Sequence, residues 1–577
     1  MTKITRRQFV RNTMVGMGGV VVSAGLATTM TGCALDELNK ARFMHGVASG
    51  DPLTDRVILW TRVTPQEEHI DKVRVYWEVS KDEHFRKMVV TGTAITHVDK
   101  DFTLKVDIVG LKPGRKYFYR FKTVNHVSPV GTTKTIASKD VEQVKFVVVS
   151  CSNYPAGYFN AYQQASQLED IDASLHLGDY LYEYARGGYA SEDAAALGRE
   201  VLPDGELLTV NDYRQRYAQY RTDPDLQAFH QAFPMIAVWD DHEVANDTWK
   251  EGAENHDDAT EGDFFARLQA ALQAYAEWMP VRPRVDTDVA SLYRSFQYGN
   301  LVNLMMLDTR LVGRDKQLSL TNYFDAAGNF DIQSYFSDIN NPNRTLLGTN
   351  QLTWLTQQLA SDAKWQVLGQ QVLMGKMELP GAIATAQLTI PEFAELAAIA
   401  QLAQTNPGAL TPEQLQLLQE KGALLQLPSL PYNLDAWDGY PVEREHILQT
   451  ARANQSNLVV LAGDTHNAWA NNLVTQAEQA SVGVELATAS ISSPGLESFL
   501  GLDTPQAVLQ TEAGVVQLIE NLQYANFSDR GFLTVTFSQD QVTSNWTYIS
   551  DIKSKDFTVL AARNKQIVVT DGSNQIA

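Results

Sequence analysis

The chain has 577 residues, enough for more than one domain, and its 44% apolar and 20% charged residues are typical of a globular protein. Its formal net charge of −21 argues against a nucleic-acid-binding surface, because contacts to phosphate backbones require clustered lysine and arginine. A small substrate that carries phosphate is not excluded, since bound cations can reverse the local electrostatic field at a site.

The first 32 residues are typical of an export signal. Arg6 and Arg7 form a twin-arginine pattern, and a weakly apolar, glycine-rich stretch, too short and too interrupted for a membrane span, follows over residues 14–30. We therefore expect residues 1–32 to be a signal peptide for the twin-arginine export machinery, and the mature protein to be periplasmic or extracellular. Cys33 completes a sequence that resembles a lipobox, which would make the mature protein a membrane-anchored lipoprotein; ordinary signal peptidase cleavage is the alternative.

Residues 40–137 are predicted to form an all-β domain. Apolar and polar residues alternate over 73–79 and 104–108, a turn follows at 110–114, and 117–121 is an aromatic strand. The pattern resembles a fibronectin type III or immunoglobulin-like β-sandwich. Because it contains no catalytic constellation, we expect it to have a structural or positioning role.

Residues 140–577 have a different pattern, in which short apolar strands alternate with helical stretches. Such alternation indicates an α/β domain built from layers, with strands predicted at 301–307 and 366–373 among others. The segment 378–430 stands apart, because it is rich in Ala, Leu and Gln and has a helix start at Thr411. We interpret it as a helical insertion that either covers the functional site or only packs against the domain.

Four predicted strands each end in side chains that bind metal ions. In chain order these are Cys151 after the first strand, Asp179 and Tyr182 after the second, Asp240, Asp241, His242 and Glu243 after the third, and Asp464 and His466 after the fourth. Strand ends are the usual place for a site in an α/β sheet, and four in one chain indicate a shared metal centre rather than unrelated turns. A phenolate beside a carboxylate that bridges two cations suits ferric iron.

Cys151 is the only cysteine expected in the mature domains, since Cys33 lies in or beside the signal. An unpaired thiol in an exported protein is either packed in the core or bound to a metal. The position of Cys151 at a strand end favours thiolate ligation to iron.

Taken together, these motifs resemble the PhoD family of alkaline phosphatases and phosphodiesterases, which belongs to the calcineurin-like metallophosphoesterases. The resemblance also includes residues 45–52, 57–62, 213–217 and 307–310, and so covers nearly the whole mature chain. It implies a metallophosphoesterase β-sandwich flanked by helices for residues 140–577, with the smaller β-sandwich in front of it.

The resemblance also implies an iron site. Residues 178–182 have the Gly-Asp-x-x-Tyr spacing that holds Fe3+ in purple acid phosphatases, which makes Tyr182 the iron-bound phenolate and Asp179 the bridge between two metals. Cys151 takes the place of an aspartate ligand and would give the iron a thiolate, and His466 would lie near the iron.

A second metal is implied at Asp241 and Asp464, with His242 in contact with the phosphoryl oxygens. Carboxylates stand here where relatives have imidazole and amide, and oxygen ligands favour Ca2+ over zinc, in keeping with the calcium for which the family is known. Gln371 is the best candidate for the remaining ligand. Other neighbours have two readings: phosphate clamp or structural ion pair for Arg282 and Arg310, and site residue or helix end for Asn246 and Asp247.

The implied function is an exported alkaline phosphatase that serves phosphate acquisition. It would hydrolyse phosphomonoesters, phosphodiesters or both by attack of a metal-activated hydroxide, since the chain has no nucleophile elbow, P-loop or Ser-His-Asp order that we identify. His242 would stabilise charge on the phosphoryl group or assist the leaving group. Two alternatives stay open: a catalytically inactive surface binding protein with the same fold, and a metal enzyme that cleaves lactones or carboxylate esters.

Overall fold

The computed structural model describes residues 20–23, 40–282, 292–326 and 328–576. Apart from residues 20–23, the predicted signal peptide lies outside the described residues, and so does Cys33. Within the described ranges, no helix is long and apolar enough to cross a membrane.

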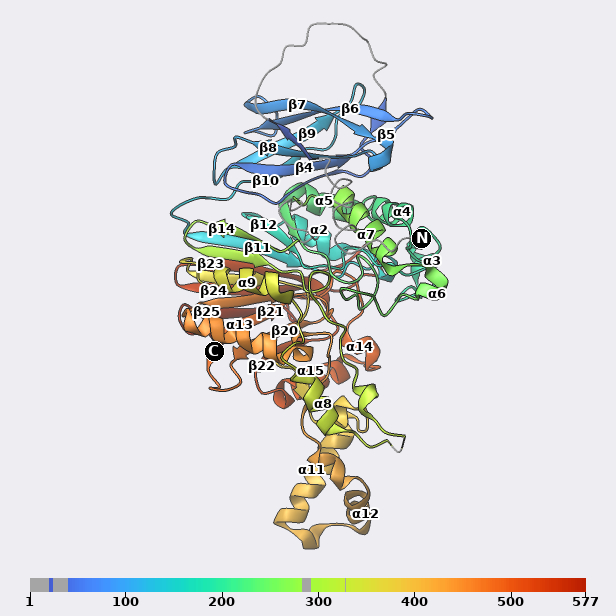
Figure 1. Ribbon diagram of the computed structural model, residues 1–577, viewed down its shortest axis with the longest axis vertical. Helices are drawn as coiled ribbons and strands as arrows, with labels where there is room; N and C mark the ends of the chain where they lie inside the picture. Colours follow the sequence, from blue (N-terminus) through green and yellow to red (C-terminus); the bar gives the residue numbers. More distant parts are fainter. Residues whose placement is uncertain (1–19, 24–39, 283–291, 327, 577) are drawn as a thin grey trace.

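Two large sheets pack face to face and form the body of the protein (Figure 1). The ring of Phe146 in the first sheet packs edge-on against Tyr298 in the second, and Trp546 donates its indole N–H to the carbonyl of Ala487 (2.8 Å). The ten-stranded sheet has the order β1 (Val20–Ser23), β8 (Thr103–Val109), β4 (Arg56–Arg62), β3 (Val47–Gly50), β13 (Pro234–Ala237), β12 (Ala173–His176), β11 (Gln143–Val149), β23 (Arg530–Ser538), β24 (Gln541–Ile549) and β25 (Lys565–Thr570). The seven-stranded sheet has the order β14 (Arg294–Tyr298), β15 (Val302–Met306), β16 (Trp365–Gly369), β19 (Leu458–Ala462), β21 (Ser481–Ala487), β20 (Ala468–Val474) and β22 (Leu522–Asn526).

The N-terminal strands form a smaller sandwich, and one of its two layers is continuous with the ten-stranded sheet of the body. Its separate layer has four strands, β10 (Gly131–Lys134), β9 (Lys116–Lys122), β6 (Lys72–Ser80) and β7 (Met88–His97), and shares a buried core with β4 and β8. The opposite layer, β8-β4-β3, pairs through β3 with β13 of the body. At this junction a Cβ on Gly50 would meet the carbonyl oxygen of Pro280 at 2.2 Å, so only glycine fits.

Helices pack on both sheets. Four of them, α2 (Asn160–Ser166), α4 (Val210–Tyr220), α5 (Pro224–Ala232) and α7 (Phe264–Trp278), share a core with the ten-stranded sheet, and α9 (Gly348–Gln358) and α13 (Pro441–Ala453) pack on the seven-stranded sheet. Two of these helices begin at N-cap residues: Thr209 forms a capping box at the start of α4, and Asp223 caps the start of α5. Among the described residues, the other α-helices outside the insertion are α3 (Ala194–Leu197), α6 (Asp258–Glu261), α8 (Ile332–Ile339), α14 (Leu496–Phe499) and α15 (Pro505–Leu518).

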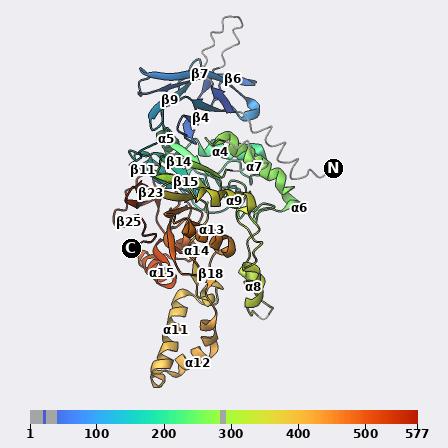
Figure 2. The same ribbon diagram turned by 60° about the vertical axis from the view of Figure 1, so that its left-hand side comes forward.

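The segment 378–430 is helical and extends away from the body (Figures 1 and 2). Two short strands, β17 (Glu378–Leu379) and β18 (Leu430–Pro431), pair at its base, and α10 (Gly381–Ala384), α11 (Ile390–Thr405) and α12 (Pro412–Lys421) follow between them. Thr411 caps α12, as the sequence predicts. The segment has a small core of its own around Leu388 and Leu396.

Candidate metal centre

The strands that precede the predicted ligands are parallel neighbours within the two sheets. β11 pairs with β12 and β12 with β13 in one sheet, and β15, β16 and β19 pair in that order in the other. Side chains that follow the carboxyl ends of β12, β13 and β19 line one pocket of about 370 Å3. Its lining residues are Asp179, Tyr184, Tyr189, Asp241, His242, Asn246, Asp247, Asn433, Asp435, Asp464, His466 and Phe499. None of them belongs to the helical insertion 378–430, which therefore does not cover the pocket.

Four of the predicted ligands have left-handed backbones. The φ angles are 61° at Cys151, 54° at Asp179, 63° at Asp464 and 62° at His466. A residue other than glycine in this region costs about 1 kcal/mol or more, and such strain is concentrated at functional sites. The chain thus bends sharply at the end of β11, β12 and β19 to bring these side chains to one place.

Gly178 allows the β12 strand end to approach its neighbour. Its φ is 108°, and a Cβ there would lie 2.3 Å from the Cβ of Asp240. The turn that delivers Asp179 therefore requires glycine both for its dihedral angle and for the close contact.

A thiol, a carboxylate, a phenol and an imidazole converge at one side of the pocket, which Asp179 and His466 line. Ligand atoms of Cys151, Asp179 and His466 all lie within 4.8 Å of one another. The hydroxyl of Tyr182 lies 3.0 Å from Oδ2 of Asp179 and 3.1 Å from Nε2 of His466. Burial, together with the charge of Asp179, raises the pKa of both Cys151 and Tyr182 well above the usual value, so without a cation both groups stay neutral.

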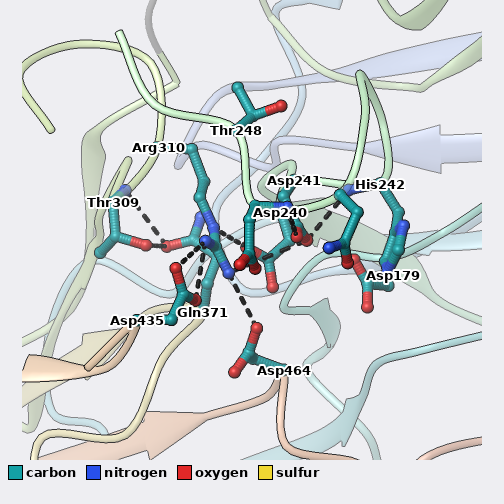
Figure 3. Close-up of polar contacts among 12 residues, drawn as sticks. Asp179, Asp240, Asp241, His242, Thr248, Thr309, Arg310, Gln371, Asp435 and Asp464 are labelled. Carbon is teal, nitrogen blue, oxygen red and sulfur yellow. Dashed lines mark hydrogen bonds and ion pairs between the residues drawn. The ribbon is translucent and has the colours of Figure 1, made fainter. Parts of the chain in front are cut away.

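Carboxylates dominate the other half (Figure 3). Asp240, Asp241 and Asp464 bring ligand oxygens within 4.8 Å of one another, and Asp241 makes a similar group with Asp179 and His242. Burial raises the pKa of Asp240 and Asp464 well above the usual value, whereas burial is outweighed at Asp241 by Arg310 and His242, which lower its pKa. Without a bound cation, the protein therefore does not keep all of these carboxyl groups ionised.

Arg310 is the fixed cation among these acids. Its side chain is fully buried, and its Nη2 lies 2.8 Å from Asp464 while its Nη1 lies 2.8 Å from Asp435. A third ion pair joins it to Asp240. Each of its three nitrogens donates to a buried or half-buried carboxylate, which favours a structural ion-pair role for this arginine over a phosphate clamp.

Two buried carboxylate oxygens indicate that cations belong here. Oδ1 of Asp179 and Oδ2 of Asp240 have no hydrogen-bond partner within the part of the chain that the structure describes. An unpaired oxygen of this kind costs free energy that a bound cation would recover. The donor chemistry fits two different ions, because sulfur, phenolate and imidazole suit a transition metal and carboxylates suit a hard cation.

Comparison with known proteins agrees with this geometry. PhoD-like phosphatases match residues 146–546, and the N-terminal domain of PhoD-like phosphatases matches residues 29–137. The chain belongs to the PhoD-like phosphatase family. It is 36% identical over 515 residues to alkaline phosphatase D of Bacillus subtilis (strain 168), a match that covers 86% of this chain and 76% of that protein. A solved structure of PhoD has 31% identity and a TM-score of 0.73, with 95% of this chain and 93% of the other covered. The family inferred from the motifs is thereby confirmed.

His242 of this PhoD-like chain is held by a carboxylate that the sequence analysis missed. Its Nδ1 lies 2.7 Å from Oε2 of Glu183, and the other oxygen of Glu183 accepts hydrogen bonds from Asn246 N and Asn255 Nδ2. Burial alone would lower the pKa of His242, but the charges of Asp241 and Glu183 raise it well above the usual value. The signal was available, because Glu183 directly follows the Gly-Asp-x-x-Tyr motif.

Glu243, the last polar residue at the third strand end, connects the two loops that follow β12 and β13. Its carboxylate accepts hydrogen bonds from the backbone N–H groups of Asp179 (3.1 Å), Tyr180 and Asp240 (2.6 Å). Burial and the charge of Asp179 raise its pKa to about 8. The ends of β12 and β13 are thus fixed relative to each other by one buried carboxyl group.

Gln371 is not placed as the remaining ligand. Its carbonyl oxygen accepts a hydrogen bond from the hydroxyl of Thr309 (2.7 Å), and its amide N–H2 donates to the carbonyl of Trp239 (2.6 Å). The side chain therefore joins three strand ends instead of lining the pocket. Arg282 is also structural, since it pairs with Asp107 (2.9 Å) in the N-terminal sandwich.

Asp247 and Asp435 add two acids to the pocket. Asn246 and Asp247 both line it, and the backbone N–H of Asp247 donates to Asp241 (2.6 Å), so these residues do more than end a helix. Burial and the charge of Asp435 raise the pKa of Asp247 to about 7. Asp435 gave no signal in the sequence, because it follows the insertion and not a strand of the body.

Proposed function

We propose that the protein is an exported alkaline phosphatase that hydrolyses phosphomonoesters, phosphodiesters or both at an iron–calcium centre. The observation that carries the proposal is the convergence of Cys151, Asp179, Tyr182 and His466 beside a second group of carboxylates. Membership of the PhoD-like phosphatase family supports the same reaction class.

Two groups of residues would hold the metals. Cys151, Asp179, Tyr182 and His466 supply the sulfur, phenolate and imidazole donors that suit Fe3+. Asp241 and Asp464 supply oxygen donors that suit Ca2+, with Asp179 between the two groups. When bound, the cations neutralise charge on the phosphoryl group and lower the pKa of water.

His242 is the acid of the proposed reaction. Because Glu183 occupies Nδ1, Nε2 is the ring atom left for the substrate, and the raised pKa keeps that nitrogen protonated. Nε2–H would hydrogen-bond a phosphoryl oxygen and pass its proton to the leaving alcohol as the P–O bond breaks. Glu183 would hold the ring in place and stabilise its charge during this step.

The route to the cell exterior belongs to the same proposal. The twin-arginine pattern at Arg6 and Arg7 supports export of the folded, metal-loaded protein, and the lipobox at Cys33 supports a lipid anchor. A periplasmic or extracellular phosphatase of this kind would serve phosphate acquisition.

Metal analysis and a visible spectrum of the mature protein, purified without chelator, test the proposed centre. We expect about one iron per chain, calcium, and a tyrosinate charge-transfer band that Tyr182→Phe abolishes. A colourless protein that contains only zinc or manganese would refute the iron assignment.

Assays of phosphate esters and carboxylate esters side by side test the reaction. Hydrolysis of carboxylate esters alone would indicate the other hydrolase class. Hydrolysis of neither by the metal-loaded protein would indicate a binding protein with the same fold.

A further inference from the structure

A second hollow of about 630 Å3 lies between the helical insertion and the body. The insertion contributes α10 and the start of α11, and the body contributes β20, α14, α15 and the segments next to them. Most of its lining is aliphatic or aromatic: Leu379, Ile383, Ala384, Ala386, Leu388, Ile390, Pro391, Tyr432, Trp469, Leu496, Leu500, Leu502, Val515, Ile519 and Phe527. Gln387, Thr389, Glu392 and Thr511 complete it.

This apolar cavity adjoins the metal pocket along two stretches of chain. Asn433 lines the metal pocket while the preceding Tyr432 lines the cavity, and Phe499 lines the metal pocket while Leu500 lines the cavity. Phe499 is 69% exposed, so it presents an apolar surface to solvent next to the residue that lines the cavity. The two hollows are therefore close neighbours in the fold.

Trp469 connects one wall of the cavity to the loop that carries Asp464 and His466. Its indole N–H donates to the hydroxyl of Thr465 (3.0 Å), and Thr465 stands between Asp464 and His466 in the chain. Trp469 also packs against Phe527 at a ring distance of 5.0 Å, which keeps this wall in place. The apolar wall and two proposed metal ligands thus belong to one local structure.

We propose that this cavity receives the alkyl chain of a phosphate ester whose phosphoryl group lies in the metal pocket. The inference rests on the proposed function and names the substrate class: phosphate esters of long-chain alcohols. Aliphatic walls release water when a methylene chain covers them. A polyol or sugar in the same place would lose its hydration with too few polar partners among these walls.

A homologous series of alkyl 4-nitrophenyl phosphates tests the proposal. The bond to 4-nitrophenol breaks in every member, so methyl, butyl and octyl esters differ only in the chain that remains on phosphorus. Each methylene that becomes fully buried should raise kcat/KM about fourfold. We expect the octyl ester to exceed the methyl ester by about 100-fold or more.

Leu500→Glu and Leu509→Glu form a matched pair of variants. Both leucines are about half exposed, at 49% and 52%, so neither change disrupts the core, but only Leu500 lines the cavity. We expect Leu500→Glu to lower the octyl-to-methyl ratio of kcat/KM by about 10-fold or more, because a carboxylate in the cavity opposes burial of the chain. Leu509→Glu should keep the wild-type ratio.

The outcomes separate the two proposals. A wild-type ratio near 1, or equal ratios in the wild type and Leu500→Glu, overturns the alkyl-chain site while hydrolysis of the methyl ester still supports the phosphodiesterase. Equal losses in both variants overturn the site as well, because the effect is then general. Failure of the metal-loaded protein to hydrolyse any of these esters or 4-nitrophenyl phosphate counts against the proposed function itself.

Discussion

Replacement of Glu183 by glutamine removes the negative charge beside His242, the proposed acid, and keeps the shape of the Glu183 side chain. Glu183 is fully buried, with one oxygen 2.7 Å from Nδ1 of His242 and the other accepting from Asn246 and Asn255. Glutamine retains a carbonyl oxygen for one of these contacts. What it cannot supply is the negative charge that stabilises the imidazolium.

The structure sets the size of the expected effect. A hydrogen bond between charged groups contributes about 1.5–3 kcal/mol, so Glu183→Gln should lower kcat by about 10- to 100-fold if the bond persists in the transition state. The sign of the pH effect follows from the raised pKa of His242, of which Glu183 is one cause. Because the protonated ring is the active form, the alkaline limb of the kcat profile should move to lower pH in the variant.

Leaving groups of different basicity give the sharpest assay. Phenyl phosphate needs a proton on its leaving oxygen more than 4-nitrophenyl phosphate does, so Glu183→Gln should slow the phenyl ester more. Glu254→Gln is the matched control, since Glu254 is exposed and also contacts Asn246. Wild-type rates in Glu183→Gln with full metal content would refute the reasoning, and an equal loss for both esters would assign His242 to the phosphoryl oxygens alone.

Three further predictions concern stability, each measured by urea unfolding. Gly178→Ala should lower the free energy of unfolding by about 2 kcal/mol or more, because its Cβ would lie 2.3 Å from Asp240 Cβ; an unchanged midpoint would contradict this. Arg310→Met should cost the metal-free protein about 3 kcal/mol or more, because it leaves buried carboxylates unpaired, and a neutral result would mean that the pairs contribute nothing net. Burial lowers the pKa of Lys105 from 10.5 to about 8, so the folded state loses its proton first and stability should rise between about pH 8 and 10.5; Lys105→Met should abolish that rise, and a slope that persists would exclude Lys105 as its source.

Sequence reasoning locates most of the site because the signals are local. A β-branched run predicts a buried strand, and the polar residue after it must lie at the strand's end, as at Cys151, Asp179, Asp241 and Asp464. The fold supplies what no local pattern encodes, namely that the ends of β12 and β13 in one sheet and of β19 in the other face one pocket. Asp435, which follows the insertion in the chain, also lines that pocket, but it stands at a position without strand or helix periodicity.

The remaining differences have physical causes of the same kind. The alternating patterns near residues 104–108 predict a strand correctly but not its partners, so the continuity of the N-terminal sheet with the body through β3 could not be inferred. Gln371 follows a buried strand as the predicted ligands do, but its side-chain amide is hydrogen-bonded to Thr309 and to the carbonyl of Trp239. Its position at a strand end therefore does not distinguish Gln371 from the predicted ligands, whereas its contacts do.

Buried carboxylate oxygens without hydrogen-bond partners would also link metal binding to the stability of the fold. Asp179 carries a left-handed backbone and an unpaired buried oxygen, and Asp240 carries another unpaired oxygen beside Arg310. Without a cation, the strained backbone and the unpaired oxygens lower the free energy of unfolding. A cation that binds only the folded chain would offset this loss and would favour the folded over the unfolded chain by mass action. Because the acids follow strands of both sheets, cations bound to them would also connect the two halves of the body.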